Sequence, residues 1–375
     1  MTDARSVLVV GGGIGGLSAA IALRKRGLAV DVVELNPKWD VYGVGIIQAA
    51  NAIRALDQLG LAERAIAEGS AMQGSRFFDR DGNQLGRVPA VELLGPRYPP
   101  MNGITRPRLH AIFQDAVRAA GADVRLGLTV ASLGQEGGGV EVTFTDGGTR
   151  RYDLVVGADG INSLVRRLAF GEDLVAEYTG QAVWRYNVPR LDGLDTLDMY
   201  VGENGKAGFV PLAPDLMYVL YIEAVPEESL AVPDELLADA MRARLAEFGG
   251  PFPAVCEHIV DPAQVVYRPV ESILVPAPWH RGRVVLIGDA AHATSPHVGQ
   301  GAAMAMEDAL VLADELAADG AVGDALERFT ARRFERCELI WSISRQIGRW
   351  EIEHVEDADF VGLTQRSIEV TAEPI

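Results

Sequence analysis

The sequence predicts an α/β protein with a Rossmann-like dinucleotide-binding domain, an inserted α+β domain built on an antiparallel sheet, and C-terminal helices. Three observations support this fold class. The chain opens with a buried strand, a glycine-rich turn and a helical pattern; alternating strand-like segments fill its middle part; and a further buried strand with long helical patterns follows. A chain of 375 residues is long enough for about two domains.

The first element is a βαβ unit. Ser6 to Val10 has the continuous apolar pattern of a buried strand, helical spacing runs from Leu17 to Arg26, and Ala29 to Leu35 is typical of a second buried strand. Further helix and strand patterns of the same domain follow at residues 109–120, 124–126, 140–144 and 154–156.

The pattern changes between residues 178 and 270. Strands are expected at 196–201, 208–212 and 217–222, and one helix at 233–248. A buried strand at 283–287 then returns to the first domain. Helices are expected at 302–316 and 325–350, followed by an acidic run at 351–359 that we interpret as a solvated helix end.

These patterns predict a discontinuous first domain. It comprises residues 1–72, 100–177 and 270–335, and the inserted domain comprises 73–99 and 178–269. Residues 336–375 are expected to form a C-terminal helix and tail. The long final helix has enough apolar positions for a core helix or a subunit contact, so a monomer and a homodimer both stay open.

Composition and charge narrow the class of protein. Hydrophobic residues make up 48% and charged residues 23%, which excludes disordered and fibrous classes. The formal net charge of −18 disfavours nucleic acid and anionic lipid as partners. No apolar stretch approaches membrane-spanning length. Two cysteines without ligands at metal spacing favour a reduced, cytoplasmic protein with no metal.

The glycine-rich turn carries the first chemical signal. It fits G-x-G-x-x-G between a strand and a helix, with Gly11, Gly13 and Gly16 at the glycine positions and Ile14 between them. Such glycines let the backbone approach a pyrophosphate at a helix N-terminus. Glu34 lies at the end of the second strand, 18 residues after Gly16, where an acid binds ribose hydroxyls.

Two aspartates end buried strands elsewhere in the chain. Asp159 follows the strand at 154–156, and Asp289 follows the strand at 283–287. Ligands of open α/β sheets bind outside the carboxyl ends of the strands. Either aspartate alone fits a helix cap, but both together beside a dinucleotide turn indicate a binding site.

Together the three motifs resemble those of the flavoprotein aromatic hydroxylases, single-component FAD monooxygenases of the p-hydroxybenzoate and salicylate hydroxylase type. The resemblance spans about residues 7–333. It implies that the fingerprint glycines and Glu34 hold the ADP half of FAD, that Asp289 binds the ribityl chain, and that Asp159 contacts FAD and a passing nicotinamide cofactor.

The resemblance extends to further positions. Arg106 matches an R-x-x-L helix start and is expected to meet the flavin pyrophosphate or ribityl group, and Val130 lies in the strand whose backbone would contact adenine. Two segments would flank the isoalloxazine ring, mainly through their backbone: Gly45 and Ile46 on one side, and Pro296, Gly299 and Gly301 on the other.

No second glycine fingerprint is present, which fits a family that is reduced by transiently docked NADH or NADPH. The resemblance implies that oxygen then forms a flavin C4a-hydroperoxide that hydroxylates a small phenol or heteroaromatic ring. The alternatives are an FAD oxidase or reductase, a monooxygenase of larger polycyclic or isoprenoid compounds, a flavin halogenase, and a flavin-fold protein without catalysis.

One tyrosine of the inserted domain is the expected catalytic or orienting residue. Tyr218 and Tyr221 are three residues apart on a predicted strand, so they face opposite sides and only one can line a pocket. Tyr218 lies seven residues after Pro211, a pattern that resembles hydroxylases whose tyrosine contacts the ring hydroxyl. We expect Trp184 and Arg185 to be packing residues; Arg185, Lys206 and Arg268 are cations that could bind a substrate carboxylate, but the sequence does not place them.

Overall fold

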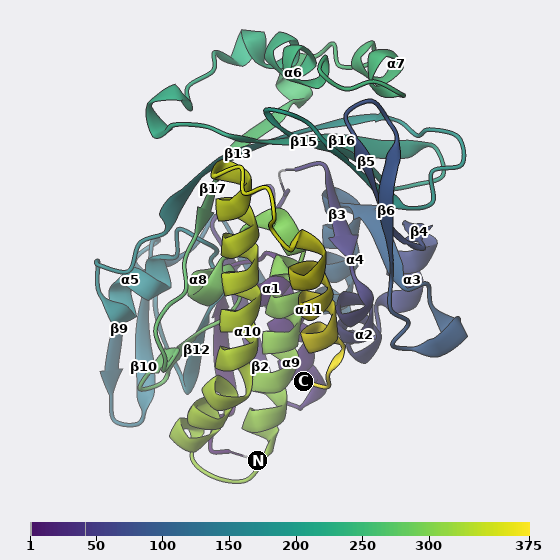
Figure 1. Cartoon of the computed structure of the whole chain (residues 1–375). Coiled ribbons are helices and arrows are strands. Elements are labelled where there is room, and N and C mark those ends of the chain that lie inside the picture. Colours follow the sequence, from purple (N-terminus) through teal and green to yellow (C-terminus); the bar gives the residue numbers. More distant parts are fainter. Residues whose placement is uncertain (1, 42) are drawn as a thin grey trace.

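The computed structural model describes residues 2–41 and 43–375 and contains two main sheets, one in the lower and one in the upper half of Figure 1. The lower sheet has six strands, and apart from β18 its pairings are parallel. Its order is β18 (His280–Arg281), β19 (Val284–Leu286), β12 (Leu154–Gly157), β1 (Ser6–Val10), β2 (Ala29–Glu34) and β8 (Asp123–Leu126).

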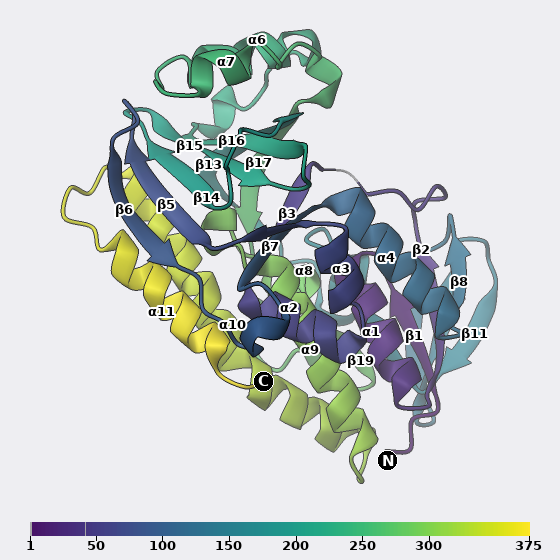
Figure 2. The same ribbon diagram turned by 90° about the vertical axis from the view of Figure 1, so that its right-hand side faces the viewer.

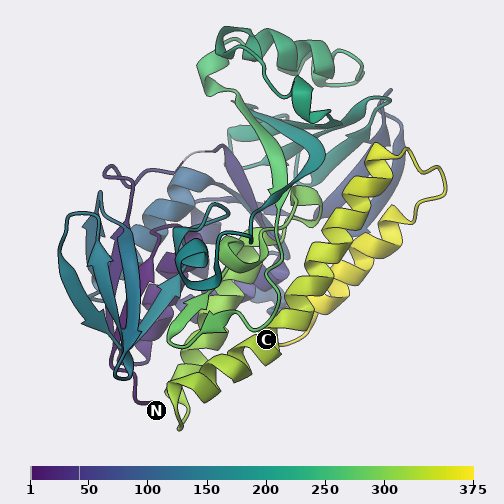
Figure 3. The same cartoon turned by 90° about the vertical axis from the view of Figure 1, so that its left-hand side faces the viewer.

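The central strands of this sheet are buried on both faces. Val7, Leu8 and Val9 are completely buried, as expected for a parallel sheet covered by other elements on each side. Helix α1 (Ile14–Lys25) packs against α4 (Arg106–Ala119) and α9 (Gly301–Ala317). A small antiparallel sheet lies beside β1 and β12 of the lower sheet and is formed by β11 (Thr149–Tyr152), β10 (Gly139–Phe144) and β9 (Val130–Glu136) (Figure 3).

The upper sheet has seven strands, mostly antiparallel. Its order is β17 (Val266–Ser272), β13 (Glu177–Pro189), β16 (Leu216–Ala224), β15 (Gly205–Pro211), β14 (Leu197–Val201), β5 (Gly74–Asp79) and β6 (Gln84–Pro89). Helices α6 (Leu237–Leu245) and α7 (Phe252–Cys256) cover its outer face, and the other face looks toward the lower half of the molecule (Figures 1 and 2).

Shorter elements connect the two halves. A three-stranded sheet has the order β3 (Gly45–Gln48), β7 (Met101–Thr105), β4 (Ser70–Met72), and helices α2 (Ala50–Leu59), α3 (Ala62–Ala67), α5 (Leu164–Phe170) and α8 (Asp289–His292) lie in the lower half. Helix α10 (Val322–Ile352) runs from the lower half to the upper sheet, with α11 (Phe360–Ala372) beside it (Figures 1 and 2).

The predicted fold class is confirmed, and two expected elements are corrected. The helix expected at 233–248 is shorter, because a single turn at Asp234–Leu236 precedes α6, which ends at Leu245 before Gly249 and Gly250. The expected C-terminal tail contains α11, which the acidic run separates from α10. The exact boundaries between the two domains stay a prediction. Within residues 2–41 and 43–375, no helix combines the length and apolar composition of a membrane span.

A buried charged cluster joins α9 to α10. Arg333 is completely buried, and it donates to Asp308 Oδ1 (2.7 Å) and Glu307 Oε2 (2.8 Å), which are also buried. Arg336 and Arg54 supply further positive charge to Glu307. Because the charges are paired and hydrogen-bonded, they tolerate a position inside the core that an isolated charge would not.

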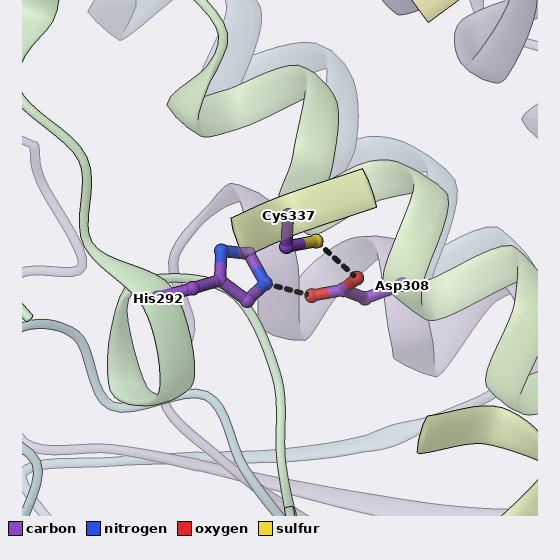
Figure 4. Close-up of side chains that lie close together, drawn as sticks. All are labelled: His292, Asp308 and Cys337. Carbon is purple, nitrogen blue, oxygen red and sulfur yellow. Dashed lines mark hydrogen bonds and ion pairs between the residues drawn. The ribbon is translucent and has the colours of Figure 1, made fainter. Parts of the chain in front are cut away.

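His292 and Cys337 also lie beside Asp308 (Figure 4), and Cys337 Sγ lies 3.4 Å from Arg333 Nη2. The ligand atoms of His292, Asp308 and Cys337 lie within 4.8 Å of one another, a spacing that a metal could use. However, Asp308 Oδ1 accepts from Arg333, and Asp308 Oδ2 accepts from the Gly288 amide (2.8 Å) and contacts His292 Nε2 (2.6 Å). The carboxylate is therefore satisfied by protein donors, and we interpret the cluster as ion pairs of the core.

The pKa shifts agree with that interpretation. Burial opposes the charge on His292. Nevertheless, Cys337 and Asp308 raise the pKa of the His292 imidazole well above its ordinary value. Burial opposes ionisation of Asp308. Nevertheless, His292 and Arg333 hold the pKa of Asp308 well below its ordinary value. At neutral pH the pair is therefore an imidazolium and a carboxylate.

Replacing Arg333 with methionine tests the cluster. Arg333→Met leaves Glu307 and Asp308 buried with less positive charge, and we expect it to lower the free energy of unfolding by about 3–5 kcal/mol. The adjacent Arg332 pairs with Glu315 nearer the surface, so Arg332→Met should cost less than about 1 kcal/mol. Urea denaturation followed by circular dichroism measures both, and equal losses would contradict the assignment.

Candidate active site

A cavity of about 590 Å³ lies at the carboxyl ends of β1, β2 and β19. It gathers most of the residues expected at the cofactor site from widely separated parts of the chain. Its lining includes Gly13, Ile14, Glu34, Gly45, Ile46, Arg106, Asp289, Pro296, Gly299 and Gly301. This edge of the sheet is where ligands of open α/β folds bind.

The fingerprint glycines have two different tasks. Gly11 has a φ of +109°, and a Cβ there would clash with the Ala158 carbonyl, while a Cβ on Gly16 would clash with the Gly11 carbonyl. A Cβ on Gly13 would meet no atom within 4 Å. Gly11 and Gly16 therefore shape the turn, whereas Gly13 keeps space open in front of it.

That open space suits a pyrophosphate. Gly13 precedes α1 and offers no side-chain cap, so the first N–H groups of a twelve-residue helix face the cavity without a protein partner from the cap residue. Such N–H groups and the helix dipole attract phosphate. The N-terminus of the seventeen-residue helix α9 reaches the same cavity at Gly301.

The turn is held by contacts to Gly12. Its N–H donates to Glu34 Oε2 (2.7 Å), and its carbonyl lies 3.0 Å from Trp39 Nε1 and 2.8 Å from His110 Nε2. Asn36 N–H donates to the second Glu34 oxygen (2.7 Å). Glu34 is thus oriented at the end of β2, and the sequence did not indicate the supporting roles of Trp39 and His110.

Asp289 and Arg106 line the cavity from two other helices. Asp289 is the first residue of α8, after Gly288 with a φ of +58°, and its side chain is open to the cavity although protein surrounds it. That enclosure raises the pKa of Asp289 above its ordinary value, with His292 and Arg106 opposing the shift. Arg106, the first residue of α4, also contacts the Gly45 carbonyl (3.4 Å).

Four expected cofactor residues are not among the residues that line this cavity: Gly11 and Gly16, which shape the turn, and Asp159 and Val130. Asp159 turns its carboxylate to the start of α5, where it accepts from the Leu164 N–H (2.7 Å) and the Val165 N–H (3.0 Å). Its side chain therefore acts as a helix cap, the alternative that the sequence left open, while its neighbours Ala158 and Gly160 line the cavity. Val130 begins β9 with a fully buried side chain.

A second cavity of about 1030 Å³ meets the first one under the upper sheet. Both cavities are lined by Arg185, Tyr218, Pro296, Gly299 and Gln300. The second cavity continues along the inner face of the upper sheet to α10 and α11, and at one end of the sheet it also reaches Tyr221, Arg244 and Glu247 on the side of α6. A cofactor in the first cavity would therefore present one end to a separate space for a substrate.

Strand alternation decides which side chains reach this junction. Trp184 and Tyr221 pack on the outer face of the upper sheet under α6 and α7, whereas Tyr218 faces inward with Val210 and Leu220. The expected opposition of the two tyrosines is confirmed, but the prediction that only one of them can line a pocket is wrong, because the second cavity also reaches Tyr221. Because Trp184 faces outward, its neighbour Arg185 faces inward, so the interpretation of Arg185 as a packing residue is wrong.

Tyr218 and Arg185 form a polar pair at the junction. Burial raises the pKa of the Tyr218 hydroxyl, although Arg185 and Arg106 oppose the shift. Burial lowers the pKa of Arg185, and Tyr218 counteracts this. Among the described residues, Arg185 makes no ion pair with a carboxylate, so its charge is available to a ligand.

Gly45 allows strand β3, which lines the first cavity, to lie close to Tyr218. A Cβ on Gly45 would clash with Leu212 and lie 2.7 Å from the Tyr218 ring. Only glycine therefore allows β3 to pack directly against the tyrosine. The expected position of Gly45 beside the flavin ring requires this close packing.

The first residue of the acidic run departs from the expected solvated helix end. Glu353, Glu356, Asp357 and Asp359 are exposed as expected, but Glu351 is mostly buried: it pairs with Lys206, accepts from Gln181 Nε2 (2.9 Å) and lies 3.1 Å from His297 Nε2. Burial opposes ionisation of Glu351. Nevertheless, Lys206 and His297 hold the pKa of Glu351 well below its ordinary value. Burial and the Lys206 charge lower the pKa of His297, so this imidazole is neutral at neutral pH.

A dinucleotide cradle that opens onto a large, mainly apolar cavity defines a class of protein: a flavoprotein that brings its cofactor to a separately bound organic substrate. The comparisons agree. The family described as "FAD binding domain" matches residues 4–341, and the chain belongs to this family. The chain is an FAD-dependent monooxygenase.

Three relatives illustrate the match. The chain is 34% identical over 347 residues to the putative FAD-dependent monooxygenase YetM of Bacillus subtilis, covering 92% of this chain and 93% of the relative. It is 33% identical over 357 residues to 2-heptyl-3-hydroxy-4(1H)-quinolone synthase of Pseudomonas aeruginosa, covering 92% and 90%. The crystal structure of Klebsiella pneumoniae HpxO with FAD and uric acid matches with a TM-score of 0.84 and 26% identity, over 100% of this chain and 94% of that one.

The Gly13→Ala variant tests cofactor binding independently of protein stability. Because the new Cβ meets no protein atom within 4 Å, Gly13→Ala should leave the thermal midpoint of the FAD-free protein nearly unchanged. The methyl group enters the space of the pyrophosphate, so FAD affinity should fall by about tenfold or more, at about 1.4 kcal/mol for each factor of ten. Flavin fluorescence titration measures the affinity.

Gly16→Ala is the matched control for that variant. Its Cβ clashes with the Gly11 carbonyl, so the loss of FAD should come with a lower thermal midpoint. An unchanged FAD affinity in Gly13→Ala would contradict the placement of the pyrophosphate.

Proposed function

We propose that the protein hydroxylates a phenolic or heteroaromatic ring, using NADH or NADPH to reduce FAD and molecular oxygen as the second substrate. The observation that carries the proposal is the meeting of the two cavities at Tyr218 and Arg185. FAD, when bound, would carry electrons from NADH or NADPH to molecular oxygen and so activate the oxygen for transfer to the ring. The chain's residues bind the ring, orient it and exclude water.

The cofactor contacts remain part of the proposal. The α1 N-terminus, Gly13 and Arg106 would bind the pyrophosphate, Glu34 the adenosine ribose, and Asp289 the ribityl chain. Gly45, Ile46 and the segment from Pro296 to Gly301 would flank the flavin ring. For Asp159 and Val130, only backbone contacts with FAD fit their positions.

Tyr218 would orient the ring. Its raised pKa keeps the hydroxyl protonated at neutral pH, so it can donate a hydrogen bond to a ring oxygen. This favours the orienting role over that of a resting proton acceptor, the two roles that the sequence left open.

Arg185 would activate the ring. A guanidinium beside a phenol stabilises the phenolate, and a phenolate is the more electron-rich ring for attack on an electrophilic oxygen. Arg185 reaches the junction from β13, and Tyr218 reaches it from the paired strand β16. The two residues can therefore contact the same ring oxygen.

The relatives support an aromatic substrate. The Klebsiella structure contains uric acid, and the Pseudomonas enzyme is named for an alkylated quinolone, both nitrogen heterocycles. A single nucleotide fingerprint supports transient docking of the nicotinamide cofactor. The free cysteines Cys256 and Cys337 suit a cytoplasmic location, which also stays a proposal.

The test is NADH and NADPH oxidation by the FAD-loaded protein with phenols, hydroxybenzoates and hydroxypyridines. We expect one ring class to accelerate the oxidation and to yield a product with one more oxygen. Oxidation that is indifferent to every ring would overturn the proposal.

Tyr218→Phe removes the donor and keeps the ring in place. We expect KM for the aromatic substrate to rise about tenfold, as for the loss of one hydrogen bond to a charged group, with a smaller change in kcat. Tyr200→Phe, on the outer face of the same sheet, is the control that should change neither. An unaltered KM in Tyr218→Phe would exclude the orienting role.

Arg185→Met tests ring activation through pH. If the guanidinium lowers the pKa of the bound phenol, its removal raises that pKa, so the acidic limb of the kcat profile should move to higher pH by about one unit. Arg185→Lys keeps the charge and should restore most of the shift. A limb that stays in place in Arg185→Met would show that Arg185 does not stabilise the phenolate.

A further inference from the structure

The second cavity is longer than a single ring needs. Its floor is the inner face of the upper sheet, where paired residues on neighbouring strands form a row: Arg185 on β13, Leu220 on β16, Gly208 on β15, Met199 on β14 and Phe77 on β5. Strands lie about 4.8 Å apart, so the floor extends about 14 Å from the Tyr218 strand, β16, to β5. A ring held at Tyr218 therefore occupies only one end.

The far part of this floor is apolar, and we call it the apolar arm, defined by Phe77, Val88, Leu197 and Met199. Leu197 and Met199 lie in the middle of a sheet and yet are only half-buried. The charged lining residues gather elsewhere in the cavity, including Lys206 and Glu223 near the ends of β15 and β16 and Glu351 of α10. The apolar arm thus offers contact surface but no charge to a ligand.

The roof of the apolar arm comes from the C-terminal helices. Ile347 and Trp350 of α10 and Phe360 and Ile368 of α11 line the same cavity, and Trp350 packs edge-on against Phe360 at 5.6 Å. Figure 2 shows α11 beside β5 and β6, the strands at this edge of the sheet. Gly208 leaves room for the Met199 side chain on the floor, because a Cβ at Gly208 would lie 2.5 Å from the Met199 sulfur.

Helix α11 is anchored firmly enough to act as a wall. Arg54 donates to the Ala372 carbonyl (2.8 Å) and the Thr371 carbonyl (3.0 Å), and Arg336 donates to the Thr371 carbonyl (2.9 Å). Positive charge at a helix C-terminus complements the helix dipole. Both arginines also pair with the buried Glu307, so the roof is attached to the charged cluster of the core.

We infer that the apolar arm binds a hydrocarbon chain attached to the aromatic ring, an alkyl or prenyl substituent. The inference rests on the proposed function for the ring end of the cavity. The elongated shape and the flexible Met199 over Gly208 favour a chain over a rigid polycyclic ring, because methionine adapts its shape to a flexible partner. The substrate then lies with its ring at Tyr218 and its chain between Met199 and Ile368.

The test uses para-alkylphenols from 4-methylphenol to 4-octylphenol and the FAD-loaded protein. Binding is followed by the change in the flavin absorbance spectrum, without reduction or turnover. Each added methylene should lower Kd by roughly three- to fourfold until the apolar arm is filled, as expected for buried CH₂ groups.

Two variants fill the apolar arm from opposite sides. Met199→Trp from the floor and Ile368→Trp from the roof should each weaken 4-octylphenol by about tenfold or more, with the Kd of 4-methylphenol within about twofold of wild type. Val361→Trp, on α11 but 59% exposed and outside the cavity, is the matched control and should bind both phenols normally. Flavin content and thermal midpoint verify that each variant is folded.

Three results would overturn the inference: a Kd that does not change with chain length, a gradient that survives in both filled variants, or polycyclic phenols that bind more tightly than every alkylphenol. Each leaves the proposed function standing if 4-methylphenol still stimulates NADH or NADPH oxidation. If no phenol perturbs the flavin or stimulates oxidation, the proposed function fails for phenols and the inference fails with it.

Discussion

The charge balance around Arg333 is the interaction on which most of the site depends. Arg333 is completely buried between Glu307 and Asp308, and each of these carboxylates also holds a different part of the site. Asp308 accepts from the Gly288 N–H and so places the turn that carries Asp289. Glu307 accepts from Asn51, which in turn donates to Gln300 beside the junction of the cavities (2.9 Å).

The same cluster reaches the substrate side through Arg54 and Arg336, which bridge Glu307 to the end of α11. The cofactor cradle, the loop before α9 and the roof of the second cavity therefore share one anchor, and their relative positions are fixed together.

Much of the cofactor half could be predicted, because its signals are local. The fingerprint glycines, Glu34 and Asp289 each follow a buried strand, and strand ends in a parallel sheet meet at one edge. Asp159 shows the limit of that reasoning: a carboxylate after a strand satisfies the next helix equally well, and here it does so. Local sequence does not distinguish the two outcomes.

The substrate half was less predictable because it depends on contacts between distant segments. Alternation placed Tyr218 correctly, and it could also have placed Arg185 once Trp184 was assigned to the core. No comparable pattern indicates that Glu351 folds back onto Lys206 and His297. Its place follows from the length of α10, which brings an acidic helix end to the upper sheet.

The proposed function depends on the transfer of oxygen from a flavin to an aromatic ring at the junction of the cavities. The most direct measurement is turnover under ¹⁸O₂ with the preferred ring compound, followed by mass spectrometry of the product. We expect one ¹⁸O atom in each product molecule. A product without ¹⁸O, with the consumed oxygen recovered as hydrogen peroxide, would contradict the proposed function.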